Sequence, residues 1–216
     1  MFIVLEGIDG CGKSTQSRRL AEWLAGIPDA GEVILTCEPG GWAGGDEVRK
    51  LVARGDFSNS WSEFFLFMMD RCEHVSRVIN PAIEGGKFIL CDRYMPSTLA
   101  YQILSSTIIT ESVTEKIIGL PEIIGLPEPD CVFLLDVGVD VAKFRMASRA
   151  KSDYFDERGE DFFERVRAGY DRLMRSDNVS KWIKVDASAD EESVFMELKG
   201  HIERIMVSER TERANK

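Results

Sequence analysis

The feature that most constrains this chain is a glycine-rich stretch near its start, Gly7-Ile8-Asp9-Gly10-Cys11-Gly12-Lys13-Ser14-Thr15. It follows the apolar run at residues 2–5 and leads into a segment with helical spacing, which predicts a strand, a loop and a helix in that order. The spacing of Gly7, Gly12, Lys13 and Ser14 is that of a phosphate-binding loop. An ordinary glycine-rich turn rarely combines this spacing with this setting. The stretch therefore predicts a nucleoside triphosphate site.

The loop suits a polyphosphate for direct physical reasons. Glycines let backbone N–H groups turn toward the phosphates, and the start of the following helix adds donors and the positive end of its dipole. Lys13 is expected to reach the β- and γ-phosphates of ATP, and the Ser14 hydroxyl to bind Mg²⁺. The predicted ATP-binding residues are Gly7, Asp9, Gly10, Cys11, Gly12, Lys13, Ser14 and Thr15.

Charge and cysteine content narrow the class of protein. Lys and Arg number 27 against 37 Asp and Glu, a formal net charge of −10, whereas general nucleic-acid binders are basic. An anionic ligand must therefore be held by a local cationic cluster, and nucleic acid is not an expected partner. The five scattered cysteines show no metal-ligand spacing and suit a reducing, cytoplasmic setting. No apolar run approaches the length of a membrane span, so no membrane partner is expected.

Apolar strands and amphipathic helices alternate along the chain. Strands are predicted at residues 2–5, 32–37, 87–92, 131–136 and 182–186, and the main helices at 13–25, 44–54, 60–80, from 97, and at 139–150, 160–175 and 190–207. This alternation predicts a five-stranded parallel sheet covered by helices on both faces. The expected fold class is the three-layer α/β/α fold of the P-loop NTPases, of the nucleoside monophosphate kinase type.

No linker divides the sequence, so residues 1–216 are predicted to form a single domain. A polar stretch suggests a mobile lid around residues 145–159, and a charged tail is expected to fray over 208–216. Residues 117–128 repeat Ile-Ile-Gly-Leu-Pro-Glu in tandem. This unit is too short for a solenoid, so the segment is predicted to be a surface insertion.

Residues that follow the strands are expected to converge, because ligands of such folds bind beyond the carboxyl ends of the strands. Gly7, Glu38, Asp92 and Asp136 all follow predicted strands. Asp92 and Asp136 both qualify as the second Mg²⁺ anchor. Asp92 is favoured because Arg93 beside it supplies positive charge where phosphates would meet, although the pair could also be a local ion pair.

The residues around the loop favour phosphoryl transfer over hydrolysis. Neither aspartate is followed by a glutamate that would activate water, and no Asn-Lys-x-Asp guanine motif is present. A nucleoside monophosphate can accept the phosphoryl group without a general base, because its own phosphate is largely dianionic at neutral pH. The reaction instead requires cations between the acceptor phosphate and the ATP phosphates, which repel each other. Arg145 and Arg149, four residues apart, could close over the γ-phosphate, although a solvated helix face explains the same spacing.

The segment 60–80 carries two kinds of side chain. An apolar stripe predicts its core face: Trp61, Phe64, Met68, Cys72, Val75 and Ile79. Phe67 and Arg71 lie four residues apart beside this stripe, close enough to act on one object. From the residues alone, Phe67 could equally be a core phenylalanine.

Taken together, the motifs resemble the thymidylate kinase (dTMP kinase) family over nearly the whole chain. The matching pieces are Glu6-Gly7-Ile8-Asp9-Gly10 with Gly12-Lys13-Ser14-Thr15, Glu38-Pro39-Gly40-Gly41, Phe67 with Arg71, Asp92-Arg93-Tyr94 with Ser97 and Ala100-Tyr101-Gln102, Arg145 with Arg149, Asp161-Phe162-Phe163, and Val185-Asp186-Ala187-Ser188. Each piece is weak alone, but their order and spacing together are specific. The resemblance implies transfer of the γ-phosphate of ATP to dTMP with Mg²⁺, for dTTP synthesis.

The resemblance also implies roles for individual residues. Phe67 would stack on thymine, and Arg71 would donate to a thymine carbonyl. Thr98 and Gln102 would complete the base contacts, and Tyr101 would pack under the deoxyribose. Asp9 would accept the sugar 3′-hydroxyl and pair with Arg93, which would hold the dTMP phosphate. The implied substrate-binding set is Asp9, Glu38, Pro39, Arg49, Phe67, Arg71, Arg93, Ser97, Thr98, Tyr101 and Gln102. The implied catalytic residues are Lys13, Arg93, Arg145, Arg149 and Asp9, the metal residues are Ser14 and Asp92, and the implied assembly is a homodimer formed through helices.

Three positions depart from the family pattern. Cys37 stands where the family often has Arg, and Trp42 where it has Thr. The predicted lid has Asp153-Tyr154-Phe155-Asp156 in place of Asp-Arg-x-Glu, so Lys151 or Arg158 would have to supply the missing cation. Two alternatives therefore stand: a kinase for another nucleoside or deoxynucleoside monophosphate, and a nucleotide-binding regulator with an impaired lid.

Overall fold

The computed structural model describes residues 1–28, 31–147, 158–176 and 182–214. Its parallel sheet has the strand order β2-β3-β1-β4-β5. The strands are β1 (Phe2–Glu6), β2 (Val33–Cys37), β3 (Phe88–Asp92), β4 (Cys131–Asp136) and β5 (Trp182–Asp186). Residues of the three central strands are buried almost throughout, which is why these strands are continuous apolar runs rather than alternating ones. The predicted five-stranded parallel sheet is confirmed.

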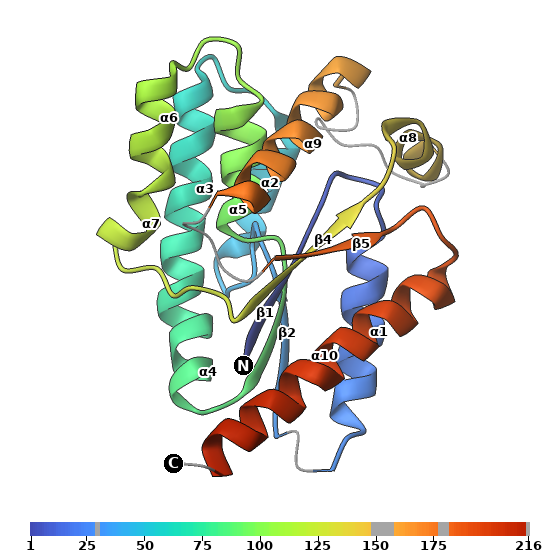
Figure 1. Ribbon diagram of the computed structural model, residues 1–216. Coiled ribbons are helices and arrows are strands. Elements are labelled where there is room, and N and C mark those ends of the chain that lie inside the picture. The colour runs from blue at the N-terminus through green and yellow to red at the C-terminus, as the bar shows by residue number, and fades with distance from the viewer. Residues whose placement is uncertain (29–30, 148–157, 177–181, 215–216) are drawn as a thin grey trace.

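Helices cover both faces of this sheet. They are α1 (Lys13–Ala25), α2 (Gly45–Arg54), α3 (Ser60–His74), α4 (Asn80–Glu84), α5 (Met95–Thr98), α6 (Glu111–Ile118), α7 (Leu120–Ile123), α8 (Val139–Ala147), α9 (Glu160–Arg175) and α10 (Glu191–Ala214), with the π-helical segments η1 (Val75–Ile79) and η2 (Leu99–Leu104). Figure 1 shows α1 and α10 side by side on one face, and α3 to α7 with α9 on the other. The three-layer α/β/α architecture is therefore as predicted. Among the described helices, none has the length and apolar character needed to cross a lipid bilayer.

The core face of α3 differs from the prediction at one position. Four of the predicted side chains are buried: Phe64, Met68, Val75 and Ile79. Trp61 is half-buried and Cys72 is exposed, so the prediction of Cys72 as a core residue was wrong. On a helix, Arg71 lies only about 20° from Phe64 whereas Cys72 lies about 80° away. Arg71 therefore takes the inward position, next to the functional cavity.

Two segments near predicted boundaries also differ. The repeat at residues 117–128 includes the end of α6 and all of α7, and its Ile117 and Leu120 pack against the core while Ile123 is 77% exposed. The repeat is thus only partly a surface insertion. The last helix, predicted to end at residue 207, continues through Ala214. The predicted tail 208–216 is helical up to that residue, and residues 215–216 lie outside the described chain.

Candidate active site

A cavity of about 400 Å³ opens where the loops after β1, β2 and β3 meet. It contains the whole predicted substrate set: Asp9, Glu38, Pro39, Arg49, Phe67, Arg71, Arg93, Ser97, Thr98, Tyr101 and Gln102. It also contains Ser14 and Asp92, and the loop residues Gly10, Gly12, Lys13 and Thr15. Residues from five separate segments of the chain therefore line one continuous space, as expected for the carboxyl ends of parallel strands.

The phosphate loop is shaped by its glycines and by Lys13. Gly10 has a φ of 84°, and a Cβ there would lie 2.3 Å from the carbonyl oxygen of Ala142 in α8, so only glycine fits. The Lys13 ammonium donates to the carbonyl oxygens of Gly7 (2.9 Å) and Ile8 (3.0 Å), which holds it inside the loop. Gly7 and the buried Cys11 form the wall of the loop and do not line the cavity.

Ser14 and Asp92 lie together at the edge of the phosphate loop. The Ser14 hydroxyl donates to Asp92 Oδ2 over 2.6 Å. Hydroxyl and carboxylate oxygens are the hard ligands that Mg²⁺ favours, so this pair fits the metal. Within the described residues there is no group of three or more His, Cys, Asp or Glu side chains that could hold a metal. Further ligands would therefore have to come from nucleotide phosphates or water.

Asp136, the alternative metal residue, is engaged elsewhere. It pairs with Arg167 (2.7 Å) and Lys184 (2.8 Å) and does not line the cavity. The hydrogen bond from Arg167 lowers the pKa of the Asp136 carboxyl, and although burial opposes this, Lys184 adds to it. The charge of Asp136 is thus balanced by two cations outside the cavity, and of the two candidate aspartates it is Asp92 that faces the phosphate loop.

Asp9 and Arg93 form an ion pair within the cavity. Arg93 Nη2 lies 2.5 Å from Asp9 Oδ1, and the Tyr101 hydroxyl donates to Asp9 Oδ2 over 2.9 Å. Burial alone would raise the pKa of Asp9, but Arg93 and Lys13, with the Tyr101 hydrogen bond, outweigh it and hold this pKa below its ordinary value. A carboxylate inside a phosphate loop is therefore charged and balanced by its arginine.

A second carboxylate, Glu6, holds the segment that follows Arg93. Arg93 has a positive φ of 73°, which is costly for a non-glycine residue. Glu6 Oε1 accepts the N–H of Tyr94 (2.8 Å), and Glu6 Oε2 accepts the hydroxyls of Ser97 (2.6 Å) and Tyr170 (2.9 Å). Burial raises the pKa of Glu6 despite these hydrogen bonds. No role was predicted for Glu6 from the sequence, although a charged residue ending a buried strand was a usable signal.

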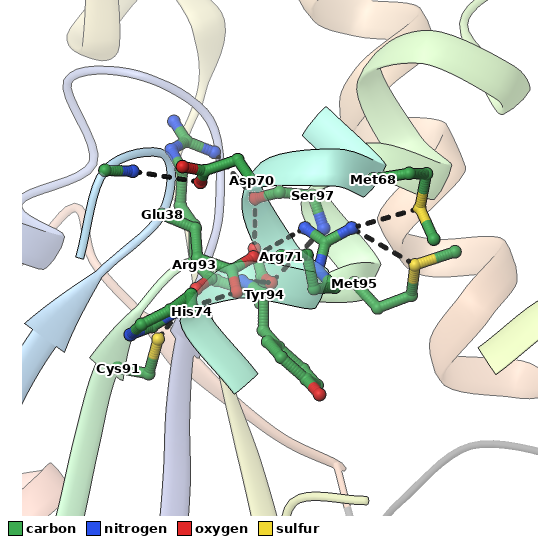
Figure 2. Close-up of polar contacts among 12 residues, drawn as sticks. Glu38, Met68, Asp70, Arg71, His74, Cys91, Arg93, Tyr94, Met95 and Ser97 are labelled. Atoms are coloured by element: carbon green, nitrogen blue, oxygen red, sulfur yellow. Dashed lines mark hydrogen bonds and ion pairs between the residues drawn. The ribbon is translucent and has the colours of Figure 1, made fainter. Parts of the chain in front are cut away.

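Arg71 is the centre of a buried polar cluster, shown in Figure 2. It is 1% exposed, pairs with Glu38 over 2.6 Å, and points Nη1 at the sulfur atoms of Met68 and Met95. His74 Nδ1 lies 2.9 Å from the other Glu38 oxygen. Glu38 thus lines the cavity while its carboxylate orients Arg71 and is itself held by His74.

Two buried polar atoms beside this cluster lack partners. Within the described chain, Arg71 Nε and Thr98 Oγ1 are buried without a hydrogen-bond partner. Both residues line the cavity, as does the half-buried Phe67. Unsatisfied buried polar groups are rare because each costs about 1–3 kcal/mol. Their position is suited to the polar edge of a flat ligand lying on the ring of Phe67.

The end of β2 and the loop after it contain two of the three departures from the family pattern, Cys37 and Trp42. Trp42 Nε1 donates to Asp70 over 2.7 Å, and the N–H of Gly40 donates to the same carboxylate over 2.9 Å. Arg49 Nη2 donates to Cys37 Sγ over 3.0 Å. Trp42 therefore ties this loop to α3, and Cys37 accepts a hydrogen bond from a cavity-lining arginine.

The lid cations that the structure describes do not line the cavity at the phosphate loop. Arg145 Nη1 donates to the carbonyl oxygen of Ala187 (2.8 Å), in the turn after β5. Arg149 and residues 148–157, including Lys151, lie outside the described chain. Arg158, offered as a replacement cation, pairs with Glu63 over 3.2 Å and does not line the cavity.

Comparison with known proteins agrees with this geometry. A family model described as "Thymidylate kinase" matches residues 5–198. The chain belongs to the thymidylate kinase family. It is 39% identical to the thymidylate kinase of Prochlorococcus marinus (strain MIT 9313) over 209 residues, 93% of each chain, and 38% identical to that of Desulfovibrio desulfuricans over 212 residues, 94% of this chain and 95% of the relative. The crystal structure of thymidylate kinase from Ehrlichia chaffeensis superposes with a TM-score of 0.71 at 30% identity, covering 94% of this chain and 98% of that one.

Membership of this family confirms the resemblance to thymidylate kinases that the sequence motifs indicated. The cavity also contains residues that the motifs did not single out, namely Val52 and Ala53 of α2. The amphipathic pattern of α2, with Val48 and Val52 buried, was the available signal for an inward face there.

Proposed function

We infer that this chain is a dTMP kinase that transfers the γ-phosphoryl group of ATP to dTMP, giving dTDP and ADP. The observation that carries the inference is a single cavity with the phosphate loop and Lys13 at one side, and with Arg93, Arg71 and Phe67 at the other. Two anionic substrates could meet there only between cations. The names of the relatives in the thymidylate kinase family support the same reaction.

The residues act mainly by positioning and by neutralising charge. Loop N–H groups and Lys13 bind the ATP phosphates, and Arg93, helped by Arg49 of the same cavity, binds the dTMP phosphate. A dianionic phosphate is nucleophilic without a base, so attack on the γ-phosphorus needs alignment and offset repulsion rather than proton removal. Arg145 and Arg149 remain predicted to act on the transferring phosphate, although Arg145 is bonded to the turn after β5 in the described structure.

The other side of the cavity suits a thymine deoxynucleotide. Phe67 would stack on the base, and the unpartnered Arg71 Nε and Thr98 Oγ1 would meet polar atoms at its edge. The Tyr101 ring would lie against the sugar where a ribose would carry its 2′-hydroxyl. Asp9 would accept the 3′-hydroxyl, which explains a carboxylate within the phosphate loop.

We propose that the divalent metal used with ATP is Mg²⁺, held by the Ser14 hydroxyl and, directly or through water, by Asp92. The short contact between these two side chains supports their joint use. When bound, the metal would neutralise charge on the β- and γ-phosphates.

The assembly and setting are also proposals. A homodimer through α3 is supported by an outward apolar stripe, with Phe65 63% and Met69 45% exposed. A cytoplasmic setting is supported by the proposed use of ATP and by five cysteines that are scattered, odd in number and without metal-ligand spacing. A single domain with a lid around 145–159 remains a prediction, since most of that segment lies outside the described residues.

The direct test is an ADP-release assay with ATP and, in turn, dTMP, dUMP, dCMP, dGMP and thymidine. A dTMP kinase should give the highest kcat/KM with dTMP. Higher efficiency with another acceptor would show a different nucleotide kinase. Tight binding of ATP and dTMP without ADP release would show a regulator.

A further inference from the structure

A buried carboxylate outside the assigned site lies behind one of the residues expected to contact the base. Glu63, in the first turn of α3, is 6% exposed. Its Oε1 accepts a hydrogen bond from Gln102 Nε2 over 2.7 Å, and its Oε2 pairs with Arg158 Nη2 over 3.2 Å. Both oxygens of Glu63 are thus engaged by donors, one from the cavity wall and one from the segment leading into α9.

This contact fixes which end of the Gln102 amide faces the cavity. An ionised carboxylate only accepts hydrogen bonds, so the amide nitrogen of Gln102 must face Glu63. The amide oxygen then points the other way. No hydrogen bond to it occurs in the described part of the chain, it is not among the buried unpartnered atoms, and Gln102 lines the cavity. The amide oxygen of Gln102 is therefore available as a hydrogen-bond acceptor for a ligand in the cavity.

An acceptor distinguishes pyrimidine bases at N3. Thymine and uracil carry N3–H, a donor, whereas the N3 of cytosine is an acceptor and would face the Gln102 oxygen unfavourably. A buried polar contact matched to one partner rejects the mismatched partner more strongly than it stabilises the right one.

We propose that Glu63 is a positioning residue that sets base specificity: by fixing the Gln102 amide it favours dTMP and excludes dCMP. The proposal rests on the proposed dTMP kinase function and adds a residue that does not itself touch the substrate. Arg158 contributes by pairing with the Glu63 carboxylate and orienting it, and by lying over the Phe162 ring at 4.4 Å it holds this pair against α9.

The variant Glu63→Gln tests this by reversing the hydrogen-bonding pattern. Arg158 can only donate, so the oxygen of the introduced amide should turn toward it and the NH₂ group toward Gln102. Gln102 would then turn its amide oxygen toward position 63 and its NH₂ group toward the cavity. The ratio of kcat/KM for dTMP to that for dCMP should fall by about tenfold or more, with the dCMP value rising in absolute terms.

Internal controls separate specificity from structure. Uracil presents the same N3–H, so the ratio for dTMP to dUMP should stay within about twofold, and KM for ATP should not change. An unchanged dTMP to dCMP ratio, or an equal fall with dTMP, dUMP and dCMP, would overturn the proposal.

A second variant covers a failure of Glu63→Gln to fold. Gln102→Leu removes the acceptor and leaves the pair of Glu63 with Arg158, and it should lower the same ratio; an unchanged ratio would again overturn the proposal. If the wild-type chain releases no ADP with dTMP, the proposed function fails separately. The ratio is then measured from the dissociation constants of dTMP and dCMP, where the same shift is expected.

Discussion

The two sides of the cavity are held in different ways. On the side proposed for dTMP, the arginines are fixed by carboxylates: Arg71 by the buried Glu38, and Arg93 by the half-buried Asp9. On the side proposed for ATP, the Lys13 ammonium is held, among the described residues, by carbonyl oxygens of its own loop and by a long contact to a thiol. One side is built from side-chain networks that reach across the fold, and the other from a local loop.

This difference implies that the dTMP side is held rigidly before substrate binds, whereas the ATP side rearranges locally. Preorganised groups lose little energy to rearrangement when the acceptor binds, because neighbouring side chains already fix their geometry. Lys13 instead exchanges backbone carbonyls for phosphate oxygens when ATP arrives. Changes on the loop side should therefore affect rate with little effect on stability, whereas changes on the dTMP side should affect both.

The largest effect is expected from Lys13→Ala. Loss of the ammonium that stabilises charge on the transferring phosphate should lower kcat by about 10³-fold. The free energy of unfolding should change by less than about 1–2 kcal/mol, because only hydrogen bonds to loop carbonyls are lost. Steady-state kinetics and urea denaturation measure the two quantities. Lys50→Ala, at a lysine 60% exposed on α2, is the matched control, and equal rates in both variants would remove Lys13 from catalysis.

Glu38→Leu tests the other side of the cavity. It leaves the Arg71 charge buried without its carboxylate, which should cost about 3 kcal/mol of stability and also raise KM for dTMP. Urea denaturation and steady-state kinetics measure these. A variant as stable as the wild type would contradict a preorganised arginine, and adding Arg71→Met to Glu38→Leu should recover stability but not dTMP binding.

Phe67→Ala sharpens the comparison within the dTMP side. Loss of base stacking should raise KM for dTMP by about 10–100-fold, while KM for ATP stays the same. Phe67→Tyr, which keeps a flat ring, should retain most of the affinity. Equal changes in both KM values would identify Phe67 as a packing residue instead.

The smallest effect is expected at the carboxylate that ends β4 outside the cavity. Because the pKa of Asp136 is lowered in the folded protein, its stabilising contribution is present above its ordinary value of 3.8 and is lost as the pH falls through the lower folded value. Its partners are about one-third exposed, so Asp136→Asn should cost only about 1 kcal/mol at neutral pH. Denaturation curves should show this difference constant between about pH 7 and 5 and shrinking below about pH 4. Activity should persist in Asp136→Asn and fall in Asp92→Asn.

Much of the fold could be predicted because local patterns suffice for it. Continuous apolar strands alternating with helices predict a covered parallel sheet, and motifs at the ends of strands lie together for topological reasons. The phosphate loop, the Asp92-Arg93 pair and the Phe67–Arg71 pair all lie in one cavity as a result.

The supporting polar network could not be predicted, because its contacts join distant segments. Glu6 and the Tyr94 N–H that it accepts are 88 residues apart in the chain, and Glu63 and Gln102 are 39 apart. Helical spacing also favoured Cys72 as a core residue, since an apolar pattern gives no reason to expect a buried arginine. Arg71 faces inward because Glu38, from another strand end, neutralises it.

The proposed reaction requires an acceptor nucleotide and the ATP phosphates to meet between Arg93 and Lys13. A crystal structure with dTMP and ADP bound tests it most directly. The expected density shows thymine on the ring of Phe67 beside Arg71 and Thr98, the dTMP phosphate at Arg93, and the ADP phosphates in the loop at Lys13. A thymine nucleotide bound outside this cavity would contradict this arrangement.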